Sequence, residues 1–330
     1  MKKQPAVPKL SRRAVHALPP PTGLKLAIIA MLAMLSIDAL ATEGGGNSYP
    51  IGNDTNFNVG VMLPEGLNTF LFYQHYTASQ LKDNNGNDNS RVSSFKLRVD
   101  AVAVRLSFVW PGVKFFGANI ETRLIQAYSM TELTLDLARP APLSPLNKGG
   151  NRSGFADTLF VPLILGWHSQ TYHQMTGVET QLPTGAYDVN EPVNIGRNYY
   201  EIAPFYALTW FPTDKIDISA KFRYAFNTTY RATNYHSGDE AAVEFSTGYH
   251  ITRALTVGIN GYVYRQTTDD KQNGVSVNGN GNRGSVDALG PYFRYSFTPK
   301  IAMALKLQQE FDAHNRPQGT RVWAQVSLPL

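Results

Sequence analysis

Apolar and polar residues alternate along most of the chain, in segments of about ten or more residues that begin near Leu67. In 215–227, for example, Ile218 and Phe222 alternate with Asp217 and Lys221. Successive side chains of a β-strand point to opposite faces, so the pattern predicts strands with one apolar and one polar face. About twelve segments show it: 68–81, 91–109, 114–130, 158–168, 172–182, 199–211, 215–227, 239–251, 254–267, 285–297, 300–312 and 319–328.

The connections between these segments alternate between short and long. The short ones lie at 110–113, 169–171, 212–214, 252–253 and 298–299. The long, polar ones lie at 82–90, 138–157, 183–198, 228–238, 268–284 and 313–318. A barrel with periplasmic turns on one rim and exposed loops on the other predicts this alternation, whereas a β-sandwich does not.

The first 41 residues have the features of a secretory signal peptide. Six basic residues precede or enter the apolar run 24–37, and Ala39 and Ala41 form a small-residue motif that predicts cleavage between Ala41 and Thr42. The alternative is a membrane anchor, but the run is shorter than the roughly 20 residues that a spanning helix needs. Export therefore fits the segment better.

Removal of this segment leaves a chain without net charge. It carries six of the 30 Lys and Arg residues and one of the 25 Asp and Glu residues, so 24 of each remain. A nucleic-acid partner would need a retained basic excess, and that partner is excluded. The sequence has no cysteine and no second long apolar run, so neither disulfides nor a bundle of membrane helices is expected.

Together these features predict an all-β fold, a transmembrane antiparallel β-barrel of about twelve strands. We expect a signal peptide at 1–41, an N-terminal segment at 42–66 and the barrel at 67–330, in the outer membrane of a Gram-negative bacterium. The expected partners are outer-membrane lipid and the barrel-assembly machinery. Strands ~4.8 Å apart and tilted ~40° give a backbone radius of roughly 12 Å, which favours a narrow or filled lumen.

Two strands are ambiguous. The apolar residues of segment 91–109 change face near Val102, which would suit either a β-bulge or a stretch that projects beyond the bilayer. Segment 158–168 is apolar on both faces, so its register is open. Aromatic residues gather near strand ends and are expected to form interfacial girdles or ordinary sheet packing: Phe115, Phe116, Tyr199, Tyr200, Trp210, Phe211, Tyr292, Tyr295 and Phe297.

Charged residues of both signs occupy the polar faces and are the candidate lumen-lining residues: Glu121, Arg123, Lys221, Arg223, Glu244, Arg294, Lys306 and Glu310. They could set selectivity or simply bridge the lumen. The Gly-, Asn- and Pro-rich N-terminal segment could enter the lumen as a plug, or it could be a periplasmic tail. Deletion of 44–62 would change the single-channel conductance only if the segment is a plug.

No catalytic or metal-binding constellation is apparent, and no cofactor is expected. His168 and Ser169 are adjacent on a strand and so point to opposite faces, which prevents His168 from activating the hydroxyl. His168 and His173 are too isolated for a convincing metal site. We therefore expect a protein that is not an enzyme.

Several motifs resemble one known family. They are Glu43-Gly44-Gly45-Gly46, Tyr49-Pro50-Ile51-Gly52, Leu165-Gly166-Trp167-His168, Leu182-Pro183-Thr184-Gly185, Asn194-Ile195-Gly196-Arg197, Ala232-Thr233-Asn234-Tyr235, Gly261-Tyr262-Val263-Tyr264 and Gly290-Pro291. The family is the "putative MetA-pathway of phenol degradation", or SphA-type outer-membrane proteins, and the resemblance covers nearly all of the chain after the signal peptide. It implies an outer-membrane channel for uptake of small hydrophobic or aromatic compounds, linked to phenol degradation. The alternative is a structural or surface-interaction barrel with a filled lumen.

Overall fold

The computed structural model describes residues 49–138, 144–230, 232–298 and 301–329. The predicted signal peptide, with its cleavage site between Ala41 and Thr42, lies outside these residues. The fold is all-β. Twelve long strands dominate it: β1(Gly66–Leu81), β2(Val92–Phe115), β3(Ala118–Leu137), β6(Thr158–His168), β7(Tyr172–Leu182), β8(Glu201–Thr213), β9(Ile216–Asn227), β11(Glu240–His250), β12(Leu255–Gln266), β15(Ser285–Ser296), β16(Ala302–His314) and β17(Pro317–Pro329).

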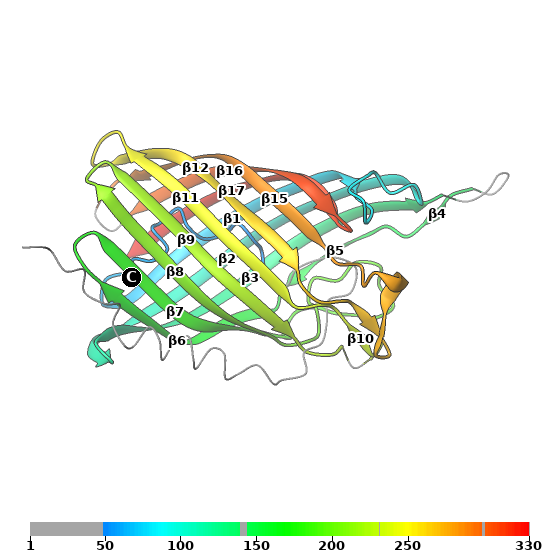
Figure 1. Ribbon diagram of the computed structural model, residues 1–330, viewed down its shortest axis with the longest axis horizontal. Coiled ribbons are helices and arrows are strands. Elements are labelled where there is room, and N and C mark those ends of the chain that lie inside the picture. The colour runs from blue at the N-terminus through cyan, green and yellow to red at the C-terminus, as the bar shows by residue number, and fades with distance from the viewer. Residues whose placement is uncertain (1–48, 139–143, 231, 299–300, 330) are drawn as a thin grey trace, which may run out of the picture. The chain divides into compact units, whose positions relative to one another are not determined.

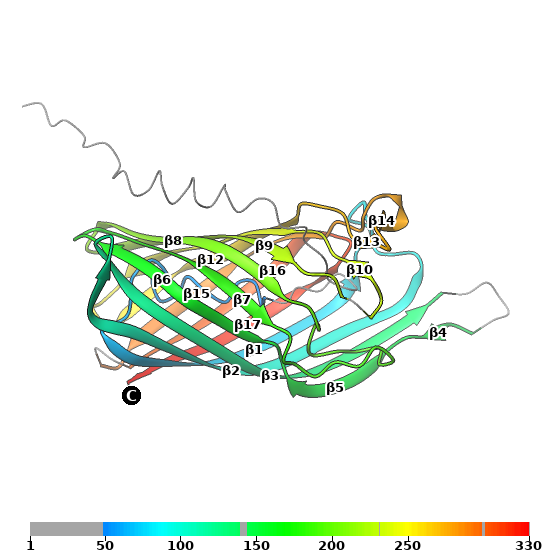
Figure 2. The same cartoon turned by 90° about the horizontal axis from the view of Figure 1, so that it is seen from below.

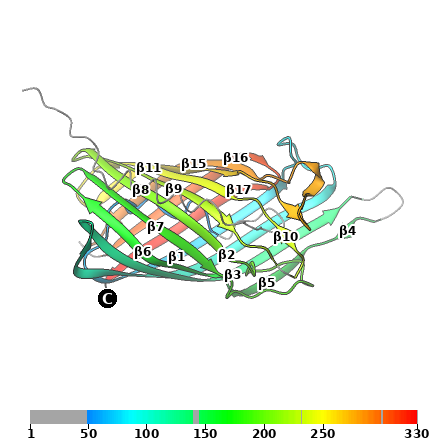
Figure 3. The same cartoon turned by 60° about the horizontal axis from the view of Figure 1, so that its bottom comes forward.

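These strands close into one antiparallel barrel, as the sequence predicts. Each long strand pairs with the long strands before and after it in the chain, and β1 closes the ring by pairing with both β2 and β17. Figures 1 and 3 show the strands tilted around a common axis. Closure satisfies the backbone hydrogen bonds of every long strand without an open edge, which a sheet surrounded by lipid requires.

The two rims of the barrel differ as expected, with two corrections. The predicted turn at 110–113 is wrong, because β2 continues through a register irregularity between Val109 and Lys114 and turns only at Phe116 and Gly117, both with positive φ. The predicted long loop at 313–318 is also wrong, because β16 ends at His314 and β17 begins at Pro317. We call the rim with the 116–117 turn the short-turn rim and the opposite one the long-loop rim.

Short strands lie at the long-loop rim. β4(Leu146–Asn147) and β5(Gly150–Phe155) pair with the end of β3, inside the predicted loop 138–157. β10(Tyr235–His236), β13(Lys271–Gln272) and β14(Val275–Ser276) form a separate small sheet, followed by the 3-10 helix Val277–Gly279. Figure 2 shows these short strands at the end of the barrel opposite the labelled C-terminus.

The charged faces of the strands point inward. On β9, Lys221 is 1% exposed, whereas its neighbour Phe222 is 46% exposed. A soluble sandwich would bury the apolar face instead, so this inversion identifies a barrel whose outer surface meets lipid. In the described part of the chain, no helix is long and apolar enough to span a membrane.

Strand β2 resolves the ambiguity near Val102. Its register with β3 is unbroken from Ser94 to Val109, so there is no bulge at Val102. The chemistry of the two faces changes instead: beyond Val102 toward the long-loop rim, Lys96 and Arg98 point outward and are exposed, while Leu97 lines an internal cavity. This matches the alternative of a stretch that projects beyond the apolar band.

Strand β6 carries the irregularity that left its register open. Its pairing with β7 shifts between Phe160 and Ile164, around Pro162, which cannot donate a backbone hydrogen bond. Val161 and Ile164 are fully buried, and Leu163 is 43% exposed.

Two of the aromatic residues expected near strand ends are not on the outer surface, because Tyr199 and Tyr292 are buried. Others lie there as expected, and Phe115, Phe116, Tyr200, Trp210, Tyr295 and Phe297 are exposed.

Candidate functional site

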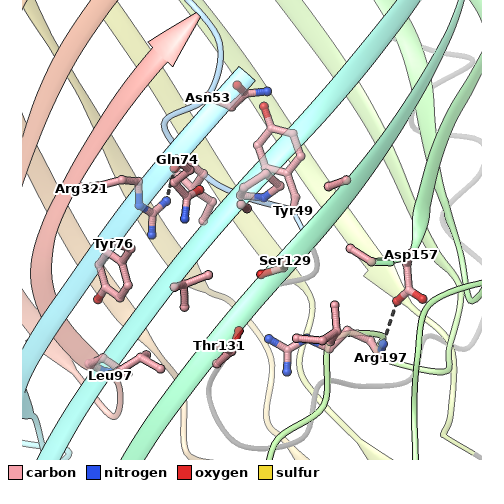
Figure 4. Close-up of a pocket in the computed structure, with 18 of the residues that line it drawn as sticks. Tyr49, Asn53, Gln74, Tyr76, Leu97, Ser129, Thr131, Asp157, Arg197 and Arg321 are labelled. Carbon is pink, nitrogen blue, oxygen red and sulfur yellow. Dashed lines mark hydrogen bonds between the residues drawn. The ribbon is translucent and has the colours of Figure 1, made fainter. Parts of the chain in front are cut away.

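The barrel encloses a cavity of about 500 Å³ in the half that faces the long-loop rim. One wall is mostly apolar and consists of the inward faces of β2 and β3. Figure 4 shows Leu97, Ser129 and Thr131 on this wall. The apolar side chains that complete it are Phe95, Val99, Ala101, Ala103, Ile125, Ala127, Leu133 and Leu135.

The opposite side of the cavity is aromatic and basic. Tyr76, Tyr262 and Trp323 contribute rings, and the Arg321 guanidinium lies 4.9 Å from the Tyr76 ring centre. Arg197 and Arg316 also line this space (Figure 4 labels Arg197 and Arg321). Such a cavity can hold an apolar molecule and offers hydrogen-bond donors to an oxygen at one end.

Asp157, between β5 and β6, is the acidic residue of the cavity lining. It accepts hydrogen bonds from the backbone nitrogens of Arg197 (2.7 Å) and Gly185 (2.8 Å), which ties two loop segments to the rim of the cavity. Burial raises the pKa of Asp157 above its ordinary value, and these two hydrogen bonds oppose the shift.

The candidate lumen-lining residues predicted from sequence lie on the inward faces of their strands. Seven are buried: Glu121, Arg123, Lys221, Arg223, Glu244, Lys306 and Glu310. The eighth, Arg294, is partly buried and donates to the backbone oxygen of Asn56 at 2.7 Å. None of the eight lines the 500 Å³ cavity.

These charges are paired along one strand, between strands that lie close together in the wall, or with the N-terminal segment. Lys221 bonds to Glu179 and to Asp54, both at 2.6 Å, and Arg223 bonds to Glu179 at 2.8 Å and to Glu201. On β3, Arg123 pairs with Glu121 at 2.9 Å. Sequence analysis missed Glu179, Glu201 and Asp54, although the alternation in 172–182 and 199–211 is the signal that could have placed the first two.

The N-terminal segment lies among these inward-facing side chains. Lys306 donates to the backbone oxygens of Asn53 (2.9 Å) and Asp54 (3.1 Å), and Gln325 donates to that of Asn53 (2.7 Å). Glu244 accepts from the backbone nitrogen of Asp54 at 2.8 Å. Residues 49–60 are therefore held inside the barrel by hydrogen bonds, and Tyr49, Pro50, Ile51 and Asn53 line the 500 Å³ cavity.

A second, smaller cavity of about 40 Å³ lies against the other side of this segment. Its apolar lining comes from Phe57, Val59, Val61, Leu63, Phe70, Phe72 and Met175, and its charged lining from Asp54, Arg105 and Arg123. Two residues, Asn53 and Phe72, line both cavities.

The histidine pair near the short-turn rim does not form a catalytic group with Ser169. The Nδ1 atoms of His168 and His173 are 3.1 Å apart, and the Ser169 hydroxyl donates to the backbone oxygen of Tyr172 at 2.9 Å. Among the residues that the structure describes, no cluster of three or more His, Cys, Asp or Glu side chains could hold a metal ion.

Fold and site together define a transmembrane β-barrel of the outer-membrane type whose lumen holds a partly apolar cavity. The chain belongs to the family described as "Putative MetA-pathway of phenol degradation", which matches residues 78–326. No curated protein matches the chain.

Solved structures support the fold. The COG4313 outer membrane channel from Pseudomonas putida F1 superposes with a TM-score of 0.68 at 16% identity, over 84% of this chain and 98% of that one. The CymD monoaromatic hydrocarbon channel has a TM-score of 0.42 at 10% identity, over 88% and 94% of the two chains. A Pseudomonas aeruginosa FadL homologue has a TM-score of 0.40 at 10% identity, over 88% and 98%. The last two similarities are too low to carry an argument.

Proposed function

We propose that this protein is a non-enzymatic outer-membrane channel for uptake of small hydrophobic or aromatic compounds. The observation that carries the proposal is the largely apolar wall of β2 and β3, which faces an internal cavity in a lumen that also holds many buried charges. A purely structural barrel has no need of Leu97, Val99 and Leu135 facing an internal space, because buried apolar groups stabilise a fold only when they are packed.

The chemistry of the cavity fits a ring that carries one oxygen function, such as a phenol or a benzoate. The ring would lie against β2 and β3, and its oxygen would face the arginine and tyrosine side chains of the opposite side. Membership of the phenol-degradation family supports the same substrate class. The long-loop rim would face the outside of the cell, as in barrels that have their short turns in the periplasm.

The N-terminal segment would act as a plug that narrows this channel. The segment forms the floor of the 500 Å³ cavity and occupies the polar part of the lumen through its hydrogen bonds to Lys306, Gln325 and Glu244. The candidate lumen-lining charges would then act mainly by holding this segment, and only secondarily by selecting solutes.

Adjacent residues on β2 provide a test with a built-in control. Leu97→Asn places a polar group on the cavity wall, and we expect about a tenfold lower benzoate influx into proteoliposomes, since losing part of one apolar contact costs about 1.4 kcal/mol. Lys96→Asn changes the exposed face of the same strand and is expected to leave influx unchanged. Equal influx in both variants and in the unmodified protein would contradict a binding role for the cavity.

The alternative function is a structural or surface-interaction barrel with a filled lumen. The buried charge pairs and the internal N-terminal segment are compatible with it. Swelling assays with phenols, benzoates and sugars separate the two functions. Impermeability to all three classes would favour the structural role, and so would unchanged growth of a knockout strain on aromatic carbon sources.

A further inference from the structure

The N-terminal segment is hydrogen bonded to one half of the barrel wall. Residues 51–60 bond to inward-facing side chains of β8, β9, β11, β15, β16 and β17. The side chains are Thr209, Lys221, Glu244, Ser246, Arg294, Lys306, Gln308, Arg321 and Gln325. We call this half, from β8 to β17, the clamping half.

The segment meets the other half of the wall, β1 to β7, mainly through apolar contacts, and its Asp54 shares the smaller cavity with Arg105 and Arg123. The Phe57 ring lies edge-on to Phe70 of β1, with 5.2 Å between the ring centres. Val59 and Met62 pack against a buried cluster of Val161 and Ile164 of β6 and Met175 of β7, which extends to Phe205 and Ala207 of β8. Apolar contacts have no directional requirement, so side chains here can change rotamer without breaking the hydrogen bonds of the clamping half.

Both internal cavities border the β1–β3 part of this second half. The larger one is lined by Phe72, Leu97 and Ile125 of β1, β2 and β3, and the smaller one by Phe70, Arg105 and Arg123 of the same three strands. Their common lining residues, Asn53 on the segment and Phe72 on β1, therefore lie between the two cavities. We call the space between these two side chains the neck.

We infer that a solute passes from the larger to the smaller cavity through the neck, along the β1–β3 wall, while residues 51–60 stay bound to the clamping half. Phe72 is then the residue that determines the size of solute admitted. The inference rests on the proposed function and adds the route and its selecting residue.

The size of the smaller cavity makes the route selective. About 40 Å³ accommodates roughly three water molecules but not an aromatic ring. A ring can enter only when Phe57 or Phe72 changes rotamer. Phe72 has less rotational freedom than Phe57 because the Arg105 guanidinium lies close to it. The guanidinium is 3.9 Å from the centre of the Phe70 ring and 5.9 Å from the centre of the Phe72 ring. Asp54, which also lines the smaller cavity, is bonded to Lys221 of β9 and therefore stays on the clamping half.

The test changes the size of residue 72 in the full-length protein reconstituted into liposomes. Phe72→Ala is expected to raise the influx of 2-naphthoate at least tenfold, and Phe72→Trp to lower the influx of benzoate at least tenfold. The matched control is Leu71→Ala, which truncates the outward-facing neighbour of Phe72 on β1, a side chain that is 43% exposed and lines neither cavity. Influx in the control is expected to stay within twofold of the unmodified protein.

A binding measurement separates failure of the route from failure of the proposed function. Trp323 lines the larger cavity, so 4-bromobenzoate bound there should quench the fluorescence of Trp323. The quenching should be equal in the unmodified protein and in Phe72→Trp. The fluorescence of the other tryptophans is measured in the same two proteins carrying Trp323→Phe and is subtracted. Quenching with unchanged influx in both Phe72 variants would overturn the route and leave the channel standing. Absence of benzoate influx above protein-free liposomes, in protein that shows the heat-modifiable mobility of a folded barrel, would overturn the proposed function itself.

Discussion

Charged residues in the lumen are tolerated because nearly all have a partner of opposite sign or a backbone oxygen. Lys221 lies between Asp54 and Glu179, and Arg223 lies between Glu179 and Glu201. An isolated buried charge would cost several kcal/mol, so removing one member of such a group is more destabilising than replacing the whole group by apolar residues. The luminal network therefore fixes the position of the N-terminal segment.

Lys306 is the residue whose loss should release that segment. Its Nζ atom donates to Asn53 O, Asp54 O and Asn56 Oδ1 at 2.9–3.1 Å. Lys306→Met removes all three bonds, and we expect the segment to be destabilised by about 3 kcal/mol, or roughly a hundredfold in the population that leaves its site. Single-channel recording should show more frequent and larger openings.

The control for this substitution is Lys215→Met, since Lys215 is exposed in the turn between β8 and β9. It is expected to leave the conductance as it is. Identical traces from Lys306→Met and the unmodified protein would show that the segment does not narrow the lumen.

Among the elements, β2 and β3 do the most to shape the cavity. In the part of each strand near the short-turn rim, the outward face is apolar. In the part near the long-loop rim, the inward face is apolar instead. Period-2 alternation continues through both parts, so the strand is unbroken while its environment changes. This change explains why the apolar residues of segment 91–109 move from one face of the strand to the other near Val102.

The small sheet of β10, β13 and β14 should respond to pH through Asp270. Burial raises the pKa of Asp270 from 3.8 to about 6, against opposing hydrogen bonds from Tyr235, Gly238 and Gln266. A raised carboxyl pKa means that the folded loop favours the protonated form. The contribution of protonated Asp270 to the stability of the loop is therefore complete below about pH 4 and is lost as the pH rises through about 6.

Hydrogen exchange measures this effect. After correction for intrinsic rates, protection of 267–284 should fall by up to about a hundredfold between pH 4 and pH 7, since two pKa units correspond to about 2.7 kcal/mol. In Asp270→Asn the dependence should disappear. Protection that rises with pH in the unmodified protein would reverse the sign and refute the assignment.

At the scale of the whole molecule, the barrel is stable only with its apolar surface in lipid. Exposed apolar side chains occur on every side of it, including Leu71 of β1, Leu124 of β3 and Phe222 of β9. Because water is absent from the bilayer core, the closed ring of strand pairs supplies the hydrogen bonds of the spanning backbone.

A charge on this surface should destabilise the barrel according to its depth. Phe222→Arg, near the middle of β9, is expected to lower the free energy of unfolding in lipid vesicles by about 2–4 kcal/mol. Ser79→Arg, on an exposed outward position near the long-loop end of β1, should cost about 1 kcal/mol or less. Guanidinium titrations provide the measurement, and equal costs at the two positions would contradict the placement of the apolar band.

The sequence by itself determined the strands and their faces. Strands 158–168 and 172–182 were predicted to the residue, and the inward placement of Lys221 and Glu244 followed from period-2 alternation, because side-chain direction along a strand is a local property. The sequence failed at 110–113 and 313–318, where Pro, Gly and Asn suggested connections but strand pairing continued to the next available turn.

Only the tertiary structure decided what these faces enclose. The hydrogen bond between Asp54 and Lys221 joins residues 167 positions apart in the sequence. The neck lies between Asn53 of the N-terminal segment and Phe72 of β1. Such pairs depend on ring closure and on the path of the N-terminal segment, neither of which leaves a periodic signal in the sequence. Local sterics fixed the alternation, whereas the partners of the luminal charges were decided by the need to pair most buried charges in a closed space.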